Sequence, residues 1–139
     1  MTKVLIDTNV ILDVLLDRHP HIIASAAVWA AVEAGRAEGV MAAHAVTNLY
    51  YLIRKDRGLT TANRMLSLIL RVFGVATVDA AVIHDALNST APDFEDSVTA
   101  SAAKLAGCVL IVTRDPKGFR GSAVPALAPE AATVLLAKT

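Results

Sequence analysis

The sequence predicts an α/β fold, with a parallel sheet of about four to five strands and helices on both of its faces. Short apolar runs alternate along the chain with longer segments in which apolar residues recur at helical spacing. Glycine, proline and acidic residues separate these segments, as they do at helix ends. The run Val109–Val112 is apolar throughout, which is typical of a central strand that is buried on both faces.

The first half of the chain begins with an apolar strand at Val4–Ile6, which stops at Asp7. A short helix is expected at Val10–Leu16. A second is expected at Ile22–Ala37, because Pro20 is well placed to begin it. The pattern continues with a strand at Val40–Ala43, a helix at Ala45–Lys55 that Gly58 ends, and a helix that Thr60 or Thr61 caps and Gly74 ends.

The second half of the chain repeats the alternation. Asp79 and Asp93 are each placed to cap a helix, because a carboxylate can accept hydrogen bonds from the free amides of the first turn. Pro129 is placed to begin the last helix. The expected elements are strands at Val75–Val78, Val109–Val112 and Val124–Leu127, and helices at Asp79–Leu87, Asp93–Leu105 and Glu130–Ala137.

The length and composition indicate one domain over residues 1–139, long enough for a core of its own. The chain is 55% hydrophobic, but no apolar run reaches the length of a membrane span. We attribute the excess to buried helices and a subunit interface. Cys108 is the only cysteine, which excludes disulfide scaffolds and cysteine-based zinc sites and favours a cytoplasmic location.

The formal net charge is +0, because thirteen basic residues balance thirteen acidic ones. A protein that binds nucleic acid tightly and without specificity usually carries a basic surplus. Any such role would therefore depend on a local patch or an oligomeric groove. One basic cluster, Arg114, Lys117 and Arg120, lies where a phosphate near Asp115 would need it, although it could equally be a solvated loop.

Two acids are predicted to follow the carboxyl ends of strands. Asp7 follows the first, and Asp115 follows Val109–Val112. If these strands are neighbours, the two carboxylates approach each other at the edge where α/β sheets bind ligands. Each acid also has an ordinary explanation, since Asp7 could simply cap a helix and Asp115 could simply be a turn residue before proline.

A third group of acids, Asp93, Glu95 and Asp96, opens the helix that precedes the fourth strand. Capping could explain this group as well, because Asp93 and Asp96 have the spacing of a cap. If the helix begins at the same sheet edge, it adds Asp96 to the other two acids. Gathered carboxylates repel one another, and a divalent cation relieves that repulsion. Oxygen ligands favour Mg²⁺ or Mn²⁺, which suits phosphoryl chemistry.

Three segments resemble the PIN-domain nuclease family, and the similarity covers essentially the whole chain. Val4–Leu12 is similar to the opening strand and first acid of the family. The Ala-rich helix from Asp96 to Ala103 resembles the one that carries its third acid. Val112–Asp115 followed by Phe119 resembles its last acidic motif.

The resemblance implies a three-layer α/β/α fold and cleavage of RNA that depends on Mg²⁺ or Mn²⁺. Small members are commonly VapC-type toxins that form homodimers and are blocked by an antitoxin. Carried over, Asp7 and Asp96 would be the principal metal ligands, and Asp115 would complete the acidic set directly or through water. Thr8 and Thr113 could orient ligands or phosphate, or could instead make local backbone hydrogen bonds.

Two positions depart from the family pattern. Asn48 stands where the family usually has a glutamate, and Gly118 stands where many relatives have an acid. An amide oxygen can still bind a hard cation, but the site loses one negative charge. We therefore expect weaker metal binding, or compensation by Asp93 or Glu95. Asn48 could also be an ordinary amide on a helix surface.

Two alternative functions remain open at this point. The first is a degenerate PIN-like module that binds RNA or protein without cutting, which Asn48 and the neutral charge support. The second is a phosphatase of the haloacid dehalogenase type, which also places an aspartate after its first strand. That chemistry needs a second aspartate two residues further on, and Asn9 occupies the place. The residues do not distinguish RNA from DNA as the substrate.

Overall fold

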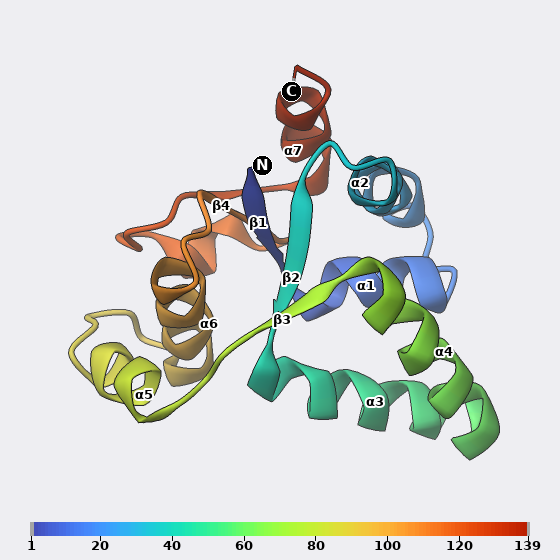
Figure 1. Cartoon of the computed structure of the whole chain (residues 1–139), viewed down its shortest axis with the longest axis horizontal. Helices are drawn as coiled ribbons and strands as arrows, with labels where there is room; N and C mark the ends of the chain where they lie inside the picture. The colour runs from blue at the N-terminus through green and yellow to red at the C-terminus, as the bar shows by residue number, and fades with distance from the viewer. Residues whose placement is uncertain (1, 139) are drawn as a thin grey trace.

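The computed structural model describes residues 2–138. Strands and helices alternate along most of the chain, as the sequence predicted (Figure 1). The strands are β1 (Lys3–Ile6), β2 (Glu38–Ala42), β3 (Gly74–Ala76), β4 (Leu110–Val112) and β5 (Ala126–Leu127). The helices are α1 (Thr8–Leu15), α2 (Ile22–Glu33), α3 (Ala43–Arg57), α4 (Leu59–Val72), α5 (Ala80–Leu87), α6 (Phe94–Leu105), the 3₁₀ turn η1 (Pro116–Phe119) and α7 (Pro129–Leu136).

The five strands form one sheet in the order β3-β2-β1-β4-β5, and every neighbouring pair is parallel. β1 is central and β4 lies beside it, with Ile6 opposite Val112. The next residues along these two strands are Asp7 and Thr113, and the amide of Asp7 donates to the Val112 carbonyl at 2.9 Å. The strand order therefore brings the ends of β1 and β4 together, as the predicted site required.

Alternate residues of the strands enter two separate cores, because successive side chains of a strand point to opposite faces. Val4 and Ile6 face the core beneath α1–α4 and α7, whereas Leu5 faces the core beneath α5 and α6. Figure 1 shows these two groups of helices on opposite sides of the sheet. The predicted three-layer α/β/α architecture is confirmed.

Several predicted helix starts are confirmed by their hydrogen bonds. Asp79 accepts from the amide of Val82 at 3.1 Å, and α7 begins at Pro129. The predicted cap of α4 is wrong, because Gly58 occupies that position instead of Thr60 or Thr61. Gly58 has a φ of 87°, which lets the chain turn directly from the end of α3 into α4.

Other boundaries shift by a few residues. α3 begins at Ala43, so β2 ends at Ala42, one residue before the predicted end of the strand Val40–Ala43. α2 ends at Glu33 instead of Ala37. The strand predicted at Val75–Val78 lies at Gly74–Ala76, as β3. Within residues 2–138, no helix combines the length and apolar character that crossing a membrane requires.

Candidate functional site at the carboxyl edge of the sheet

Thr113 joins the acids that follow the two central strands. Its hydroxyl donates a hydrogen bond to Asp7 Oδ2 at 2.8 Å and accepts one from the amide of Asp115 at 3.1 Å. The side chain is fully buried, so its orientation is determined by these partners. Asp7 Oδ1 also accepts from the amide of Thr8 at 2.9 Å. Asp7 therefore caps α1 while its other oxygen is tied to β4, so the capping and functional interpretations of this acid are compatible.

Two polar residues of α1 anchor the loop after β4. Asn9 accepts from the amide of Arg114 at 3.3 Å, and its own amide lies 3.5 Å from Thr113 Oγ1. One turn further along α1, Asp13 is fully buried and forms an ion pair with Arg114 over 2.8 Å. Neither role was predicted from the sequence. An acid in the middle of the apolar run Val10–Leu16 was the available signal, since a buried acid needs a partner.

The three residues of the basic cluster predicted near Asp115 therefore have different environments. Arg114 is engaged with buried Asp13, which also accepts from Ser25 at 3.1 Å. Lys117 and Arg120 are exposed on η1 and just after it. Only these last two cations are left available for a phosphate beside Asp115.

The start of α6 carries the third group of acids. Asp93 caps the helix, because its Oδ1 accepts from the amide of Asp96 at 3.0 Å. Carboxylate oxygens of Asp93, Glu95 and Asp96 lie within 4.8 Å of one another. Partial burial, followed by the charges of Asp93, Glu95, Asp7 and Asp115, raises the pKa of Asp96 from 3.8 to about 6. Asp96 therefore lies in the field of all the other acids at this edge.

Gly118 marks the space between the acids of α6 and η1. A Cβ atom at this position would lie 2.9 Å from Asp96 Oδ2 and 3.2 Å from Asp115 Oδ2. Both carboxylates therefore turn toward the same small space, which any larger residue would fill. The departure from the family pattern at Gly118 thus leaves room between two of the predicted ligands.

Asp7 is the most buried acid of the site, and burial raises its pKa. The hydrogen bonds from Thr113 and Thr8 oppose this effect, and Glu95 adds to it. His44, in the first turn of α3, lies on the same side: its Nε2 is 3.4 Å from Glu95 Oε1 and 3.4 Å from Thr99 Oγ1. The imidazole therefore belongs to the border of the site.

Asn48 is exposed on α3, one turn beyond His44. Residues four apart on a helix share a face, so Asn48 lies on the same face of α3 as His44. The structure thus brings Asp7, Asp96 and Asp115 to one edge, with Thr113 between two of them, Asp93 at the cap of α6 and Thr8 at the start of α1. The role of Asn48 stays a prediction.

This donor set fits a divalent cation. The ligands on offer are carboxylate oxygens, which suit Mg²⁺ and Mn²⁺. Burial is the largest cause of the raised pKa of Asp96, and the neighbouring negative charges, which a bound cation would offset, add to it. The tightest trio of the described acids is Asp93, Glu95 and Asp96, and Asp7 and Asp115 lie outside this trio.

The model of one protein family, described as the PIN domain, matches residues 3–117. The chain belongs to the PIN domain family. The match extends from β1 into η1 and so includes every acid of the site. None of the curated protein sequences is a significant match to this PIN domain.

Solved structures share the fold of this PIN domain at low sequence identity. FitAB bound to an IR36 DNA fragment is 22% identical with a TM-score of 0.70, over 91% of this chain and 95% of that one. A toxin–antitoxin complex from Klebsiella pneumoniae is 17% identical with a TM-score of 0.70, over 91% and 97%. VapC20 of Mycobacterium tuberculosis, described as a toxin that cleaves the sarcin-ricin loop, is 15% identical with a TM-score of 0.63, over 78% and 86%.

Proposed function

We propose that this PIN domain is an endoribonuclease dependent on Mg²⁺ or Mn²⁺ and acts as the toxin of a toxin–antitoxin pair. The observation that carries the proposal is the convergence of Asp7, Asp96 and Asp115, whose mutual repulsion contributes to the raised pKa of Asp96. A PIN domain with acids gathered at the carboxyl edge of its sheet has the donors that phosphodiester hydrolysis needs.

The roles of the individual residues follow from their positions. Asp7, Asp96 and Asp115 would hold the cation, which when bound neutralises the scissile phosphate and lowers the pKa of water. Thr113 keeps the carboxylate of Asp7 in a fixed orientation, since it donates to Oδ2 at 2.8 Å. Lys117 and Arg120 are exposed beside Asp115 and can contact phosphates without reading the base sequence.

The toxin assignment is supported by the structural neighbours. One is described as a toxin that cleaves the sarcin-ricin loop, and another is a toxin–antitoxin complex. By the same reasoning we propose a cognate antitoxin. The family resemblance supports a homodimer, and the single cysteine supports a cytoplasmic site of action. Arrested growth of a bacterial host on induction of the wild-type protein, but not of the Asp7→Asn variant, would support a toxic nuclease.

The decisive experiment is cleavage of labelled single-stranded RNA by the purified protein in Mg²⁺, Mn²⁺ or EDTA. Asp7→Asn and Asp96→Asn should abolish cleavage, whereas Glu130→Gln should not. Glu130 is a matched control because it is an exposed acid in the first turn of α7, away from the site. Single-stranded DNA of the same sequence distinguishes a ribonuclease from a general nuclease. Equal cleavage by the wild type and both site variants would refute the assignment.

A second candidate function is a PIN domain that binds RNA or protein without cutting it. Asn48 favours it, because a neutral amide stands where the family usually has a glutamate. Absence of cleavage by the wild type with either metal, together with cleavage by Asn48→Glu, would identify Asn48 as the lesion and support this alternative. The phosphatase alternative is set aside, because the chain belongs to another family and Asn9 holds the loop after β4.

A further inference from the structure

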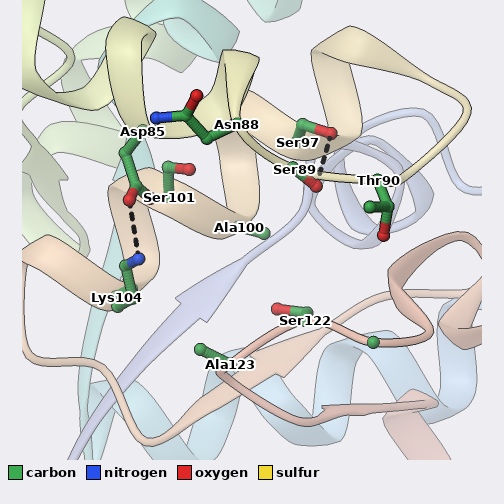
Figure 2. A pocket seen from close by; sticks show the side chains of 11 residues that line it. Asp85, Asn88, Ser89, Thr90, Ser97, Ala100, Ser101, Lys104, Ser122 and Ala123 are labelled. Carbon is green, nitrogen blue, oxygen red and sulfur yellow. Dashed lines mark hydrogen bonds and ion pairs between the residues drawn. The ribbon is translucent and has the colours of Figure 1, made fainter.

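A groove leads away from the acids along one side of α6. Its larger part is a hollow of about 310 Å³ between α5, α6 and the loop after η1 (Figure 2). A narrower hollow of about 30 Å³ is lined by Asp96 and Gly118 and so opens on the acids. The two hollows adjoin, because six residues line both of them: Ser89, Thr90, Ser97, Ala100, Gly121 and Ser122. We call the two adjoining hollows together the α6 groove.

The α6 groove follows one face of its helix. Ser97, Ser101 and Lys104 line the larger hollow and are spaced three to four residues apart, so they lie in a row. The row extends about 10 Å, at about 1.5 Å per residue, and begins beside Asp96. A polynucleotide whose scissile phosphate lies at the acids would therefore place a neighbouring nucleotide in this groove.

The chemistry of the groove is polar and nearly free of net charge. Ser89 and Ser97 lie on one wall with their hydroxyls 3.3 Å apart, and Ser122 lies opposite them (Figure 2). At the far end Lys104 donates to Asp85 at 2.8 Å. Hydrogen bonds from Lys104 and Ser101 lower the pKa of Asp85, so its negative charge is matched by the lysine. Hydroxyls and a paired charge can bond a ribose 2′-OH and the edge of a base.

Two further features concern the size and the selectivity of the groove. Ala100, Gly121 and Ala123 leave it open, because their side chains are small or absent. The residues that line the larger hollow, all within the described part of the chain, include no aromatic side chain on which a base could stack. Recognition in the larger hollow would therefore rest on hydrogen bonds, with the amide of Asn88 as the group best able to distinguish bases.

We propose that the α6 groove binds the nucleotide adjacent to the scissile phosphate of a single-stranded RNA substrate. The proposal rests on the nuclease function proposed above, since it places the scissile phosphate at Asp7, Asp96 and Asp115. It adds a substrate subsite, and a source of sequence preference, at residues outside the acidic site.

The test fills the groove without removing a hydrogen bond. Ala123 is exposed at its wall, so Ala123→Phe should obstruct the groove. Ala131→Phe is the matched control, because Ala131 is an exposed alanine on α7 outside the groove. We would measure binding of a fluorescein-labelled single-stranded RNA of mixed sequence by anisotropy in Ca²⁺. Ala123→Phe should weaken binding about tenfold and Ala131→Phe should not.

Two further measurements test the base preference of the groove and the folding of the variant. Asn88→Ala should change which nucleotide is preferred beside the cut, as read by sequencing the products from a randomised RNA. Hydrolysis of bis(4-nitrophenyl) phosphate, which is too small to reach the groove, should be the same in the wild type and Ala123→Phe. A variant that is merely misfolded would lose this activity too.

The outcomes separate the two proposals. RNA binding that Ala123→Phe weakens, in a wild-type protein that cuts neither RNA nor the small diester, would retain the groove as an RNA site and overturn the nuclease. Equal RNA binding by Ala123→Phe and Ala131→Phe, or no RNA binding by the wild type, would overturn the groove.

Discussion

Replacing Asp96 by asparagine should stabilise the metal-free protein at neutral pH while it removes a proposed cation ligand. The carboxylate is partly buried among Asp93, Glu95, Asp7 and Asp115, and this environment raises its pKa from 3.8 to about 6. Ionised Asp96 therefore costs folding free energy at pH 7.5. An amide of the same shape carries no charge and avoids that cost.

The size of the effect follows from the displaced pKa. A change from 3.8 to about 6 corresponds to about 3 kcal/mol, at about 1.4 kcal/mol for each pKa unit. Because Asp96 is partly exposed, solvent screening reduces this to about 1–2 kcal/mol. Losing a negative charge from the first turn of α6 opposes it by about 0.5 kcal/mol. The net stabilisation is about 1 kcal/mol, or about 3–6 °C in Tm.

The stabilisation by Asp96→Asn depends on pH. Because folding raises the pKa of Asp96, the contribution of this residue to the free energy of unfolding is fully present below its ordinary pKa of 3.8. That contribution is lost as the pH rises through about 6. The gain in Tm should therefore be present at pH 7.5 and vanish below about pH 4.

The assay is thermal unfolding in EDTA at a series of pH values, with Glu130→Gln as the matched control, because it also removes an acid from the first turn of a helix. Mg²⁺ should raise the Tm of the wild type and not that of Asp96→Asn. A Tm of Asp96→Asn equal to or below that of the wild type at pH 7.5 would refute the electrostatic account of the site.

Other variants test how the site is held. Arg114→Ala should destabilise the protein by about 3–5 kcal/mol in urea titrations, because it leaves the buried charge of Asp13 unpaired. Asp13→Asn should destabilise it by less, and the reverse order would contradict this account. Gly118→Ala should weaken Mn²⁺ binding by about tenfold in calorimetry, because its Cβ would lie 2.9 Å from Asp96 Oδ2; unchanged affinity would mean that the ion binds elsewhere. Thr113→Val should lower stability by about 1–3 kcal/mol, since it leaves buried hydrogen-bonding groups unpaired; Thr113→Ser should retain most of it.

The sequence by itself predicted the fold class and which strand each acid follows or which helix it begins. Strand and helix periodicities are local, so the alternation could be read directly. Local chemistry also predicted that Asp79 and Asp93 cap helices and that Pro129 begins one. The predicted helix limits were less accurate at Thr60, because the φ of Gly58 follows from how two helices meet and not from the threonines.

Tertiary structure alone decided which of these residues meet. The order β2-β1-β4 places Asp7 opposite Thr113, although more than a hundred residues separate them, and no local pattern encodes that crossover. The ion pair of Asp13 with Arg114 could not be predicted from the sequence either, because the fold decides which residue packs against a buried acid. The raised pKa of Asp96 also depends on the fold, since its causes include burial and the charges of Asp7 and Asp115, which come from two other segments of the chain.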